Sequence, residues 1–260
     1  MEGLRAQSNS DNQIEYEVEN GVFKKLCEDA LTDVSQVPYV LVIDEINRGN
    51  VSRVFGELIT LIEPSKRKGQ CEALSVQLSY SKRPFSVPAN VYLIGTMNTA
   101  DRSLSGLDIA LRRRFDFREM PPLPDLLDSV IVEGVDVGEL LRVMNERIEL
   151  LLDRDHCLGH AYFMPLLESP SLERLARIFK SNILPLLQEY FFEDWQRIQW
   201  VLNDHRKPAA LRFVSAPESN LVALFGEDVN VNGQNRRWTV NEGAFNRVDA
   251  YAAVIDADER

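Results

Sequence analysis

Two short apolar runs in the first hundred residues have the pattern of buried parallel strands. Residues 40–43 (VLVI) and 91–94 (VYLI) are continuously apolar, as expected of strands that are covered on both faces. Asp44 and Glu45 follow the first run, and Asn98 closes the segment that contains the second. Because open α/β sheets bind ligands outside the carboxyl ends of their strands, these polar residues are candidates for a functional site.

Helical spacing and turn residues predict the elements around these strands. A short helix is expected over residues 23–30, and a second one follows Asn50, a suitable N-cap, and ends at Pro64. Its apolar stripe consists of Val51, Val54, Phe55, Leu58, Ile59 and Ile62. The polar first twenty residues are expected to be frayed, residues 73–80 alternate as in a hairpin, and residues 115–117 form a short strand.

Beyond residue 120 the apolar periodicity becomes purely helical. Pro121, Pro122 and Pro124 mark a linker, and helices are expected over residues 137–152 and 172–202. Pro185 should begin or kink a helix within the second of these stretches. The sequence thus predicts an α/β class with a parallel sheet over residues 1–120, a helical lid over 121–205 and a tail over 206–260.

The polar groups at the strand ends suit nucleotide hydrolysis. An acid in the position of Asp44 can hold a hydrated Mg²⁺ that bridges phosphate oxygens, and Glu45 can orient or deprotonate the attacking water. Asn98 can donate to a phosphate oxygen while it accepts from that water. The alternatives are a strand end with solvated acids and an asparagine that caps a helix.

Three successive arginines, Arg112, Arg113 and Arg114, end the next predicted helix. Neighbouring side chains on a helix project about 100° apart, so local ion pairs can use at most one or two of them. A remaining guanidinium can reach the phosphates of a neighbouring subunit and stabilise the charge that develops during transfer. A basic helix end that complements the helix dipole is the alternative.

Taken together, these motifs resemble the McrB-like branch of the AAA+ motors, the nucleotide-driven subunits of modified-cytosine restriction systems. The resemblance rests on residues 44–50 (DEINRGN), 55–63 (FGELITLIE), 95–103 (GTMNTADRS) and 110–115 (ALRRRF), and it covers roughly residues 23–195. The third of these segments is specific to the branch, whereas the acid pair is common to most motors of the superfamily.

The resemblance implies a role for each matching residue. Asp44 and Glu45 become Walker B acids, Asn98 becomes sensor 1, and Asp101 and Arg102 complete the branch signature. Arg113 and Arg114 become candidates for the trans-acting arginine finger, with Arg112 a weaker third. His160 lies in residues 158–163 (LGHAYF), similar to a lid segment of the branch in which Ala161 is usually serine. The likeness further implies ATP or GTP as substrate, Mg²⁺, a ring of subunits, a McrC-like nuclease partner and DNA.

One element of this pattern is missing. No Gly-x-x-x-x-Gly-Lys-Ser/Thr occurs, because none of the thirteen glycines is followed by lysine. The family places this phosphate-binding loop well upstream of the Walker B strand, and only 43 residues precede Asp44. We therefore expect a fragment of a longer motor, with little or no hydrolysis by the chain alone. A non-catalytic assembly or regulatory module is the alternative, and a metal-dependent nuclease using Asp44 and Glu45 ranks third.

Composition bears on the location of the protein, the state of its cysteines and its contact with DNA. The sequence contains no apolar stretch near the roughly 20 residues that span a bilayer, and its start lacks a signal-peptide core, so a cytoplasmic location without membrane contact is expected. The three cysteines are odd in number and suggest reduced thiols. A net charge of −11 confines DNA contact to local basic loops, residues 65–69 and 81–84, which either line a pore or are solvated turns. His156, Cys157 and His160 are weak candidates for a metal site.

Overall fold

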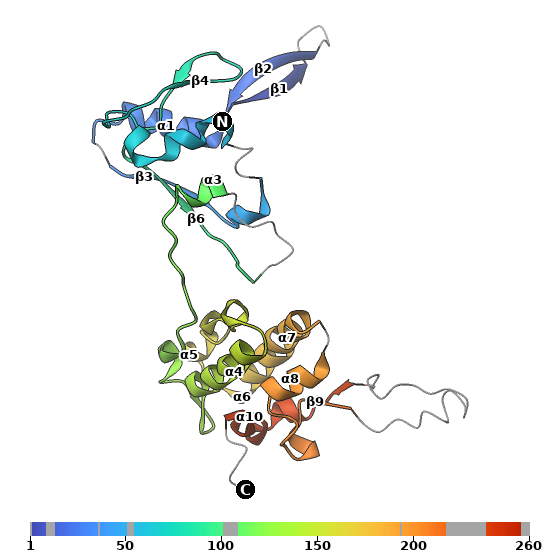
Figure 1. Ribbon diagram of the computed structural model, residues 1–260. Helices are drawn as coiled ribbons and strands as arrows, with labels where there is room; N and C mark the ends of the chain where they lie inside the picture. Colours follow the sequence, from blue (N-terminus) through green and yellow to red (C-terminus); the bar gives the residue numbers. More distant parts are fainter. Residues whose placement is uncertain are drawn as a thin grey trace. The chain divides into compact units, whose positions relative to one another are not determined.

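The computed structural model describes residues 2–8, 14–35, 37–50, 55–100, 109–192, 194–216 and 238–255. The chain folds into two compact units, Met1–Arg118 and Glu119–Arg260 (Figure 1). Each unit has a hydrophobic core of its own. Within the described ranges, every helix is too short or too polar to cross a lipid bilayer.

A parallel strand pair organises the first unit. Strand β3 (Tyr39–Ile43) pairs with β6 (Val91–Gly95) in a register that sets Ile43 opposite Gly95. This pairing confirms the α/β class with a parallel sheet. Burial of both faces is wrong, however, because alternate side chains are exposed by 46–61%, namely Val40, Val42, Tyr92 and Ile94.

The other face of the strand pair lies on the core of the first unit. Helix α1 (Val22–Thr32) covers this face, with Phe23 edge-to-face on Phe55 at 5.3 Å between ring centroids. The expected helix after Asn50 is a 3₁₀-helix, η2 (Gly56–Ile62), in its described part, and it buries Leu58, Leu61 and Ile62. Gly56 has a φ of 51°, which interrupts an α-helix at this point. A further 3₁₀ turn, η3, covers Pro64–Lys66.

The described residues among the first twenty are not frayed as expected, since β1 (Glu2–Ser8) and β2 (Ile14–Asn20) pair antiparallel as a first hairpin. The Glu2 carboxylate links this strand pair to the rest of the unit. It lies 2.6 Å from Lys24 Nζ on α1, both side chains are buried, and it also accepts a hydrogen bond from the Ser81 backbone N–H. Ser81 lies in the turn of a second hairpin, β4 (Val76–Gln77) with β5 (Pro84–Phe85), so Glu2 joins both hairpins to α1.

Three short segments complete the first unit. The 3₁₀ turn η1 (Ile46–Arg48) follows β3, and helix α3 (Ile109–Arg112) precedes the chain's passage to the second unit. The strand expected over residues 115–117 is wrong, because these residues form no strand. Phe115 packs against the core instead, and Phe117 is exposed.

Helices dominate the second unit. Helix α4 (Val137–Leu151) begins at Asp136, whose side chain accepts from the Glu139 N–H at 2.9 Å. It follows the 3₁₀ turn η4 (Pro124–Leu127) and a small hairpin, β7 (Ile131–Val132) with β8 (Val135–Asp136). The turns η5 (Arg154–His156) and η6 (His160–Tyr162) and helix α5 (Pro165–Glu168) come next.

The long stretch predicted over residues 172–202 is divided into four pieces. Helix α6 (Leu172–Ile178) continues through a π-helical turn, η7 (Phe179–Ile183), into α7 (Leu184–Tyr190), and α8 (Trp195–Val201) follows. Pro185 stands in the first turn of α7, as expected of a residue without an N–H. The π turn lies directly before α7, at the junction between α6 and the helix that begins with Leu184 and Pro185.

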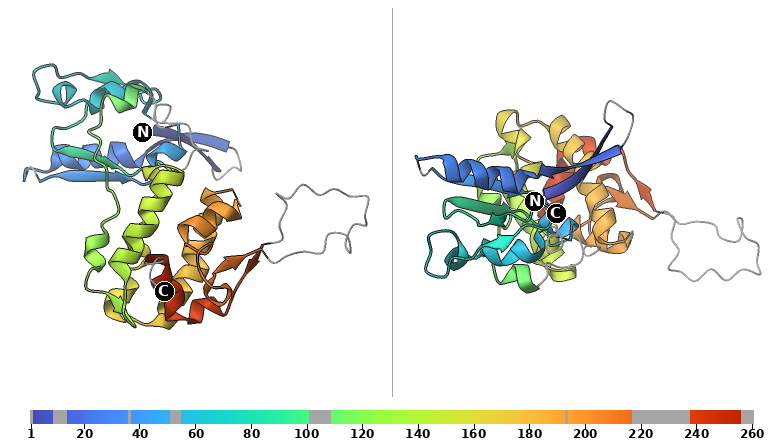
Figure 2. Two further views of the ribbon diagram at one scale, coloured as in Figure 1. Left: turned by 60° about the horizontal axis from the view of Figure 1, so that its bottom comes forward. Right: turned by 90° about the horizontal axis from the view of Figure 1, so that it is seen from above.

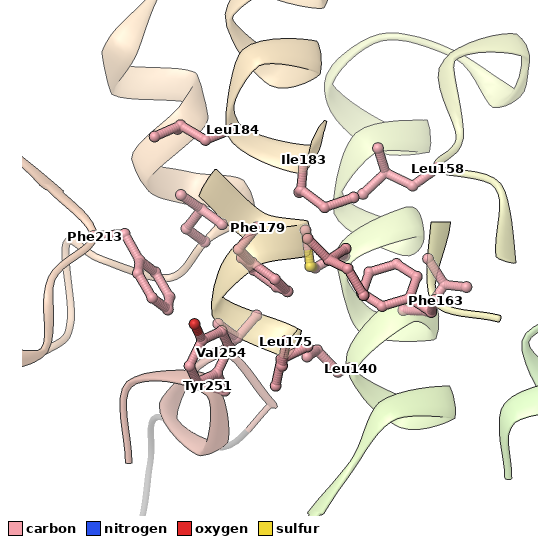
Figure 3. Packing of buried hydrophobic residues seen from close by; sticks show 14 of the residues in the cluster. Leu140, Leu158, Phe163, Leu175, Phe179, Ile183, Leu184, Phe213, Tyr251 and Val254 are labelled. Carbon is pink, nitrogen blue, oxygen red and sulfur yellow. The ribbon is translucent and has the colours of Figure 1, made fainter. Parts of the chain in front are cut away.

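Residues 206–260, expected as a turn-rich tail with a few strands or short helices, contain such elements in their described part, and this part packs into the core of the second unit. This part contains η8 (Ala209–Leu211), β9 (Val214–Ser215), β10 (Thr239–Val240), η9 (Ala244–Asn246) and α10 (Val248–Ile255). Tyr251 on α10 is fully buried and meets Phe179 edge-to-face at 4.9 Å (Figure 3). Helix α10 lies beside α4 in Figures 1 and 2 alike. Apolar contact with α4 and η7 therefore makes this segment part of the helical unit.

Candidate functional site

The ends of β3 and β6 are joined by a set of hydrogen bonds centred on Thr96. The Thr96 N–H donates to Ile43 O at 3.0 Å, and Thr96 O accepts from the Ile46 N–H at 2.9 Å. The Thr96 hydroxyl donates to Asp44 Oδ1 and accepts from the Glu45 N–H at 3.0 Å. Both predicted acids are thus held at the carboxyl end of the strand pair, next to the residue that follows β6.

Glu45 has an unusual backbone conformation. Its φ and ψ are both 50°, in the left-handed region that non-glycine residues seldom adopt. This turn directs the chain from β3 into η1, and the Glu45 carboxylate forms an ion pair with Arg48 Nε one turn later. Strained backbone of this kind gathers at functional sites, where the surrounding contacts hold it in place.

Asn98 lies at the same end of the strand pair. The Asn47 side-chain NH₂ donates to Asn98 O at 3.2 Å, and Asn47 itself is buried. Asn98 Oδ1 accepts from the Ala100 N–H at 3.1 Å, which leaves its NH₂ group as the donor that can face a phosphate. The three expected residues Asp44, Glu45 and Asn98 therefore share one edge of the structure.

Close packing also fixes the spacing of the two strand ends. A Cβ atom on Gly95 would lie 2.9 Å from Ile46 Cδ1, closer than real Cβ atoms approach their neighbours. Ile46 is buried in the core of the unit. A side chain at residue 95 would therefore need the Ile46 side chain to shift where the chain after β3 crosses the end of β6.

Asp101 and Arg102 lie outside the described residues, so the structure says nothing about their places. In the ranges it does describe, no three side chains of His, Cys, Asp or Glu gather as a metal cluster. Asp44 and Glu45 are thus two neighbouring acids at the strand end, with the Thr96 hydroxyl beside Asp44. Mg²⁺ is commonly held by one or two carboxylates together with substrate phosphates and water, a donor set with which this arrangement is compatible.

The three arginines differ in their surroundings. Arg114 Nε lies 2.8 Å from Glu63 Oε1, and only 16% of the Arg114 side chain is exposed. The Arg112 guanidinium lies over the Phe117 ring, 5.5 Å from its centroid. Arg113 is exposed, and among the described residues its guanidinium has no ion-pair or hydrogen-bond partner. Arg113 is thus the one best placed to reach another molecule.

The two basic loops also differ from each other. In residues 65–69, Lys66 pairs with Glu72 at 2.8 Å, and Arg67 is half-buried with hydrogen bonds to the carbonyl oxygens of Ile62 and Val91. Burial lowers the pKa of Arg67. Arg67 is therefore a structural residue of the core and is removed from the candidates for DNA contact. Lys82 and Arg83 are exposed in the turn between β4 and β5.

The histidines of the second unit have structural contacts. His160 Nδ1 accepts from the Leu123 N–H at 3.0 Å, which joins η6 to the segment before η4. His156 Nδ1 lies 2.6 Å from Asp153 Oδ1, and its ring stands edge-to-face on Tyr190 at 5.0 Å. Within the described part of the chain, no three side chains of His, Cys, Asp or Glu come together at these rings, which speaks against the metal-site alternative for His156, Cys157 and His160.

Sequence reasoning assigned no role to Thr96, Asn47, Arg48 or Gly95. Parallel register is the signal that could have found Thr96, because Ile43 lies opposite Gly95 and Asp44 therefore lies opposite Thr96. Asn47 and Arg48 belong to the same motif as the acids, but only the left-handed turn at Glu45 brings them back toward the strand ends.

Two family models match the chain. Residues 6–115 match the model described as AAA domain (dynein-related subfamily), and residues 136–199 match the model described as McrB, alpha-helical lid domain. These ranges fall within the first and second units respectively.

Two curated relatives are similar over most of the chain. The EcoKMcrB subunit of a type IV methyl-directed restriction enzyme, from Escherichia coli strain K12, is 38% identical over 208 residues, which are 73% of this chain and 44% of that protein. The YdiS component of the type II restriction enzyme BsuMI, from Bacillus subtilis strain 168, is 26% identical over 204 residues, 71% of this chain and 58% of that protein. The chain thus spans about half the length of these relatives. The lid match, the AAA match and the identity to the E. coli subunit together show that the chain belongs to the McrB-like AAA+ proteins.

Proposed function

We propose that this chain is a nucleoside-triphosphatase module of a restriction motor, acting in the cytoplasm. In this proposal it assembles into a ring and couples ATP or GTP hydrolysis to DNA translocation for a McrC-like nuclease partner. One observation carries the proposal: Asp44 and Glu45 are held by Thr96 at the carboxyl end of a parallel strand pair, with Asn98 after the neighbouring strand.

Each residue then has a chemical task. Asp44 would hold Mg²⁺, which when bound neutralises charge on the phosphate oxygens. Glu45 would orient or deprotonate the attacking water, and the Asn98 NH₂ group would donate to a phosphate oxygen. The ion pair with Arg48 keeps the Glu45 carboxylate oriented in the absence of nucleotide. Asp101, Arg102 and His160 would contribute to nucleotide binding, as the likeness to McrB-like motors implies.

The arginine finger is assigned to Arg113. This proposal is supported by its exposure and by the contrast with Arg114, which is mostly buried against Glu63 of its own unit. An arginine that stabilises transferring phosphate in a neighbouring subunit must be able to leave its own surface. Lys68, Lys82 and Arg83 are exposed and are the remaining candidates for contact with DNA in a pore.

The missing Gly-x-x-x-x-Gly-Lys segment limits what the chain does alone. Without backbone amides and a lysine to hold the β- and γ-phosphates, the acids have no positioned substrate. We therefore propose little hydrolysis by the 260-residue chain itself. A non-catalytic oligomerisation or regulatory module is the second candidate function, and the same absence favours it.

Hydrolysis assays with ATP and GTP separate the two candidates. They compare this chain with a form extended upstream in its reading frame to a phosphate-binding loop. We expect turnover only in the extended form, its loss in Glu45→Gln and a strong decrease in Arg113→Ala but not in Arg112→Ala. Turnover by the 260-residue chain that Glu45→Gln abolishes would contradict the proposed inactivity. If neither form binds nucleotide, the non-catalytic module is the better account.

A further inference from the structure

We infer that Thr96 is a positioning residue for the two Walker B acids, acting through its side-chain hydroxyl. The catalytic role of this positioning rests on the proposed function. The positioning itself can be tested without measuring nucleotide hydrolysis. Thr96 is exposed, so its side chain does not serve to fill the core. Its hydroxyl instead contacts both acidic residues at once.

The hydroxyl is suited to this task because it donates one hydrogen bond and accepts others. Its proton goes to Asp44 Oδ1, which restricts the rotation of that carboxylate and leaves Oδ2 available for a ligand. Its oxygen accepts the Glu45 N–H at 3.0 Å. A single side chain thus sets the direction of the first acid and the backbone position of the second.

The Glu45 backbone is the reason that this second bond matters. Its left-handed conformation is unfavourable for a residue with a Cβ atom and persists only when neighbouring contacts hold it. Besides the bond from the Thr96 hydroxyl to Asp44, the residues after β3 donate three bonds to those after β6, from the Glu45 N–H, the Ile46 N–H and the Asn47 NH₂ group. Of these three, only the first has a side-chain acceptor, so a hydroxyl-free residue at position 96 removes it and leaves the other two.

Hydrogen exchange on the 260-residue chain tests the positioning directly. We would compare wild type with Thr96→Val, which keeps the shape, Thr96→Ala as a second hydroxyl-free variant, and Thr96→Ser, which keeps the hydroxyl. Amide exchange by NMR should become about tenfold faster or more at Glu45 in the valine and alanine variants, since a lost hydrogen bond is worth about that factor. The serine variant should exchange as wild type, and the Thr96 amide, which donates to Ile43 O, should change less than about twofold.

Two results would overturn the inference. One is a Glu45 exchange rate that is the same in the valine, alanine and serine variants. The other is an equal rise at Glu45, Ile46 and Thr96, because this would indicate general loosening of the strand end and not the loss of one hydroxyl.

Binding of Mn²⁺ alone, followed by electron paramagnetic resonance, separates this inference from the proposed function. We expect Asp44→Asn to abolish binding, the valine variant to weaken it several-fold and the serine variant to retain it. If wild type and Asp44→Asn bind Mn²⁺ equally while exchange at Glu45 still depends on the hydroxyl, the metal role of Asp44 is wrong and the positioning by Thr96 stands. If Asp44→Asn loses binding but the valine variant matches wild type, Thr96 does not position the first acid.

Discussion

Arg114 and Glu63 form an ion pair inside the first unit, with 2.8 Å between Arg114 Nε and Glu63 Oε1. The pair links the end of α3 to the residue that follows η2. Its burial distinguishes Arg114 from Arg113, which precedes it in sequence and is exposed. From the sequence, Arg113 and Arg114 were equal candidates for the arginine finger. The packing of Arg114 against Glu63 distinguishes the two.

This separation predicts different effects on stability. Arg114→Ala should destabilise the first unit by about 1–2 kcal/mol, because it removes the cation from an ion pair with a partly buried carboxylate. Arg113→Ala should change stability by less than about 0.5 kcal/mol, as surface substitutions usually do. The rate at which the buried Cys27 thiol reacts with a labelling reagent in increasing urea measures the opening of this unit. Equal effects of the two substitutions would contradict the assignment.

Glu2 makes the first unit sensitive to acid. Burial opposes its ionisation, but hydrogen bonds from Lys24 and Ser81 prevail and lower the pKa of Glu2 from 4.5 to about 2. The folded state thus binds this proton less readily than the unfolded state does. The stabilisation from ionised Glu2 is therefore complete above about pH 4.5 and is lost as the pH falls from there toward 2.

Urea unfolding followed by circular dichroism at several pH values between 2 and 7 measures this effect. Glu2→Gln should be less stable than wild type at neutral pH, and the difference should shrink below pH 4.5. Glu19→Gln is the matched control, because Glu19 pairs with Arg5 on the exposed face of the same hairpin. A difference for Glu2→Gln that stays constant across the range would count against the buried pair.

Asp204 and Lys207 form a fully buried pair in the second unit. Lys207 Nζ lies 2.9 Å from Asp204 Oδ1 and 4.3 Å from the centroid of the Phe213 ring, and Asp204 Oδ2 accepts from the Val214 N–H. Lys207→Met leaves the carboxylate buried without its cation and should destabilise the unit by about 3 kcal/mol or more. Combining it with Asp204→Asn should recover part of this loss.

All three tryptophans lie in the second unit, so their fluorescence in urea reports the unfolding of this unit in the Lys207 and Asp204 variants. Lys180→Met is the control, since the ion pair of Lys180 with Glu242 is at the surface and should contribute about 1 kcal/mol at most.

Burial lowers the pKa of Lys207 from 10.5 to about 8, although Asp204 acts in the opposite direction. Between about pH 8 and pH 10.5 the unfolded state binds more protons at Lys207 than the folded state does. The contribution of Lys207 to the free energy of unfolding should therefore rise with pH in this range, as measured by urea unfolding at several pH values.

Gly95 controls the spacing between the ends of β3 and β6. Gly95→Ala should disturb the turn after β3, because the new Cβ atom would lie 2.9 Å from Ile46 Cδ1. Overpacking of this kind typically costs about 1–3 kcal/mol. Ile46→Val removes the Cδ1 atom, so the double variant should lose less than the sum of the single changes in the Cys27 labelling assay. Strict additivity would show that the two residues do not meet.

Much of the architecture follows from the apolar pattern of the sequence. The parallel pair, α1 and α4 were predicted because their apolar residues recur over complete elements. The pair of β1 and β2 was missed because both strands are mostly exposed and polar, and because no local pattern reports a contact as distant as that of Glu2 with Lys24. The helix after Asn50 was assigned the wrong type because Gly56 supplies a left-handed turn that periodicity cannot detect.

The sequence predicted those residues of the candidate site that have a characteristic type and follow a recognisable strand. Asp44, Glu45 and Asn98 follow strands whose register brings them to one edge. Thr96 was missed because a threonine after a strand is unremarkable until its partner across the ladder is known. The difference between Arg113 and Arg114 depends on the position of Glu63, which is distant in sequence, and therefore on packing.

The π-helical turn at Phe179–Ile183 holds one residue more than a regular helix needs over the same length. Such a turn takes up an additional residue within a single turn of the helix, so the helix after it keeps nearly the direction that a continuous α-helix would have. Leu184 and Leu187, which follow the turn, are buried in the core of the second unit. A segment that looks like an imperfection in helix geometry therefore absorbs an extra residue of sequence without changing which side chains after it face the core.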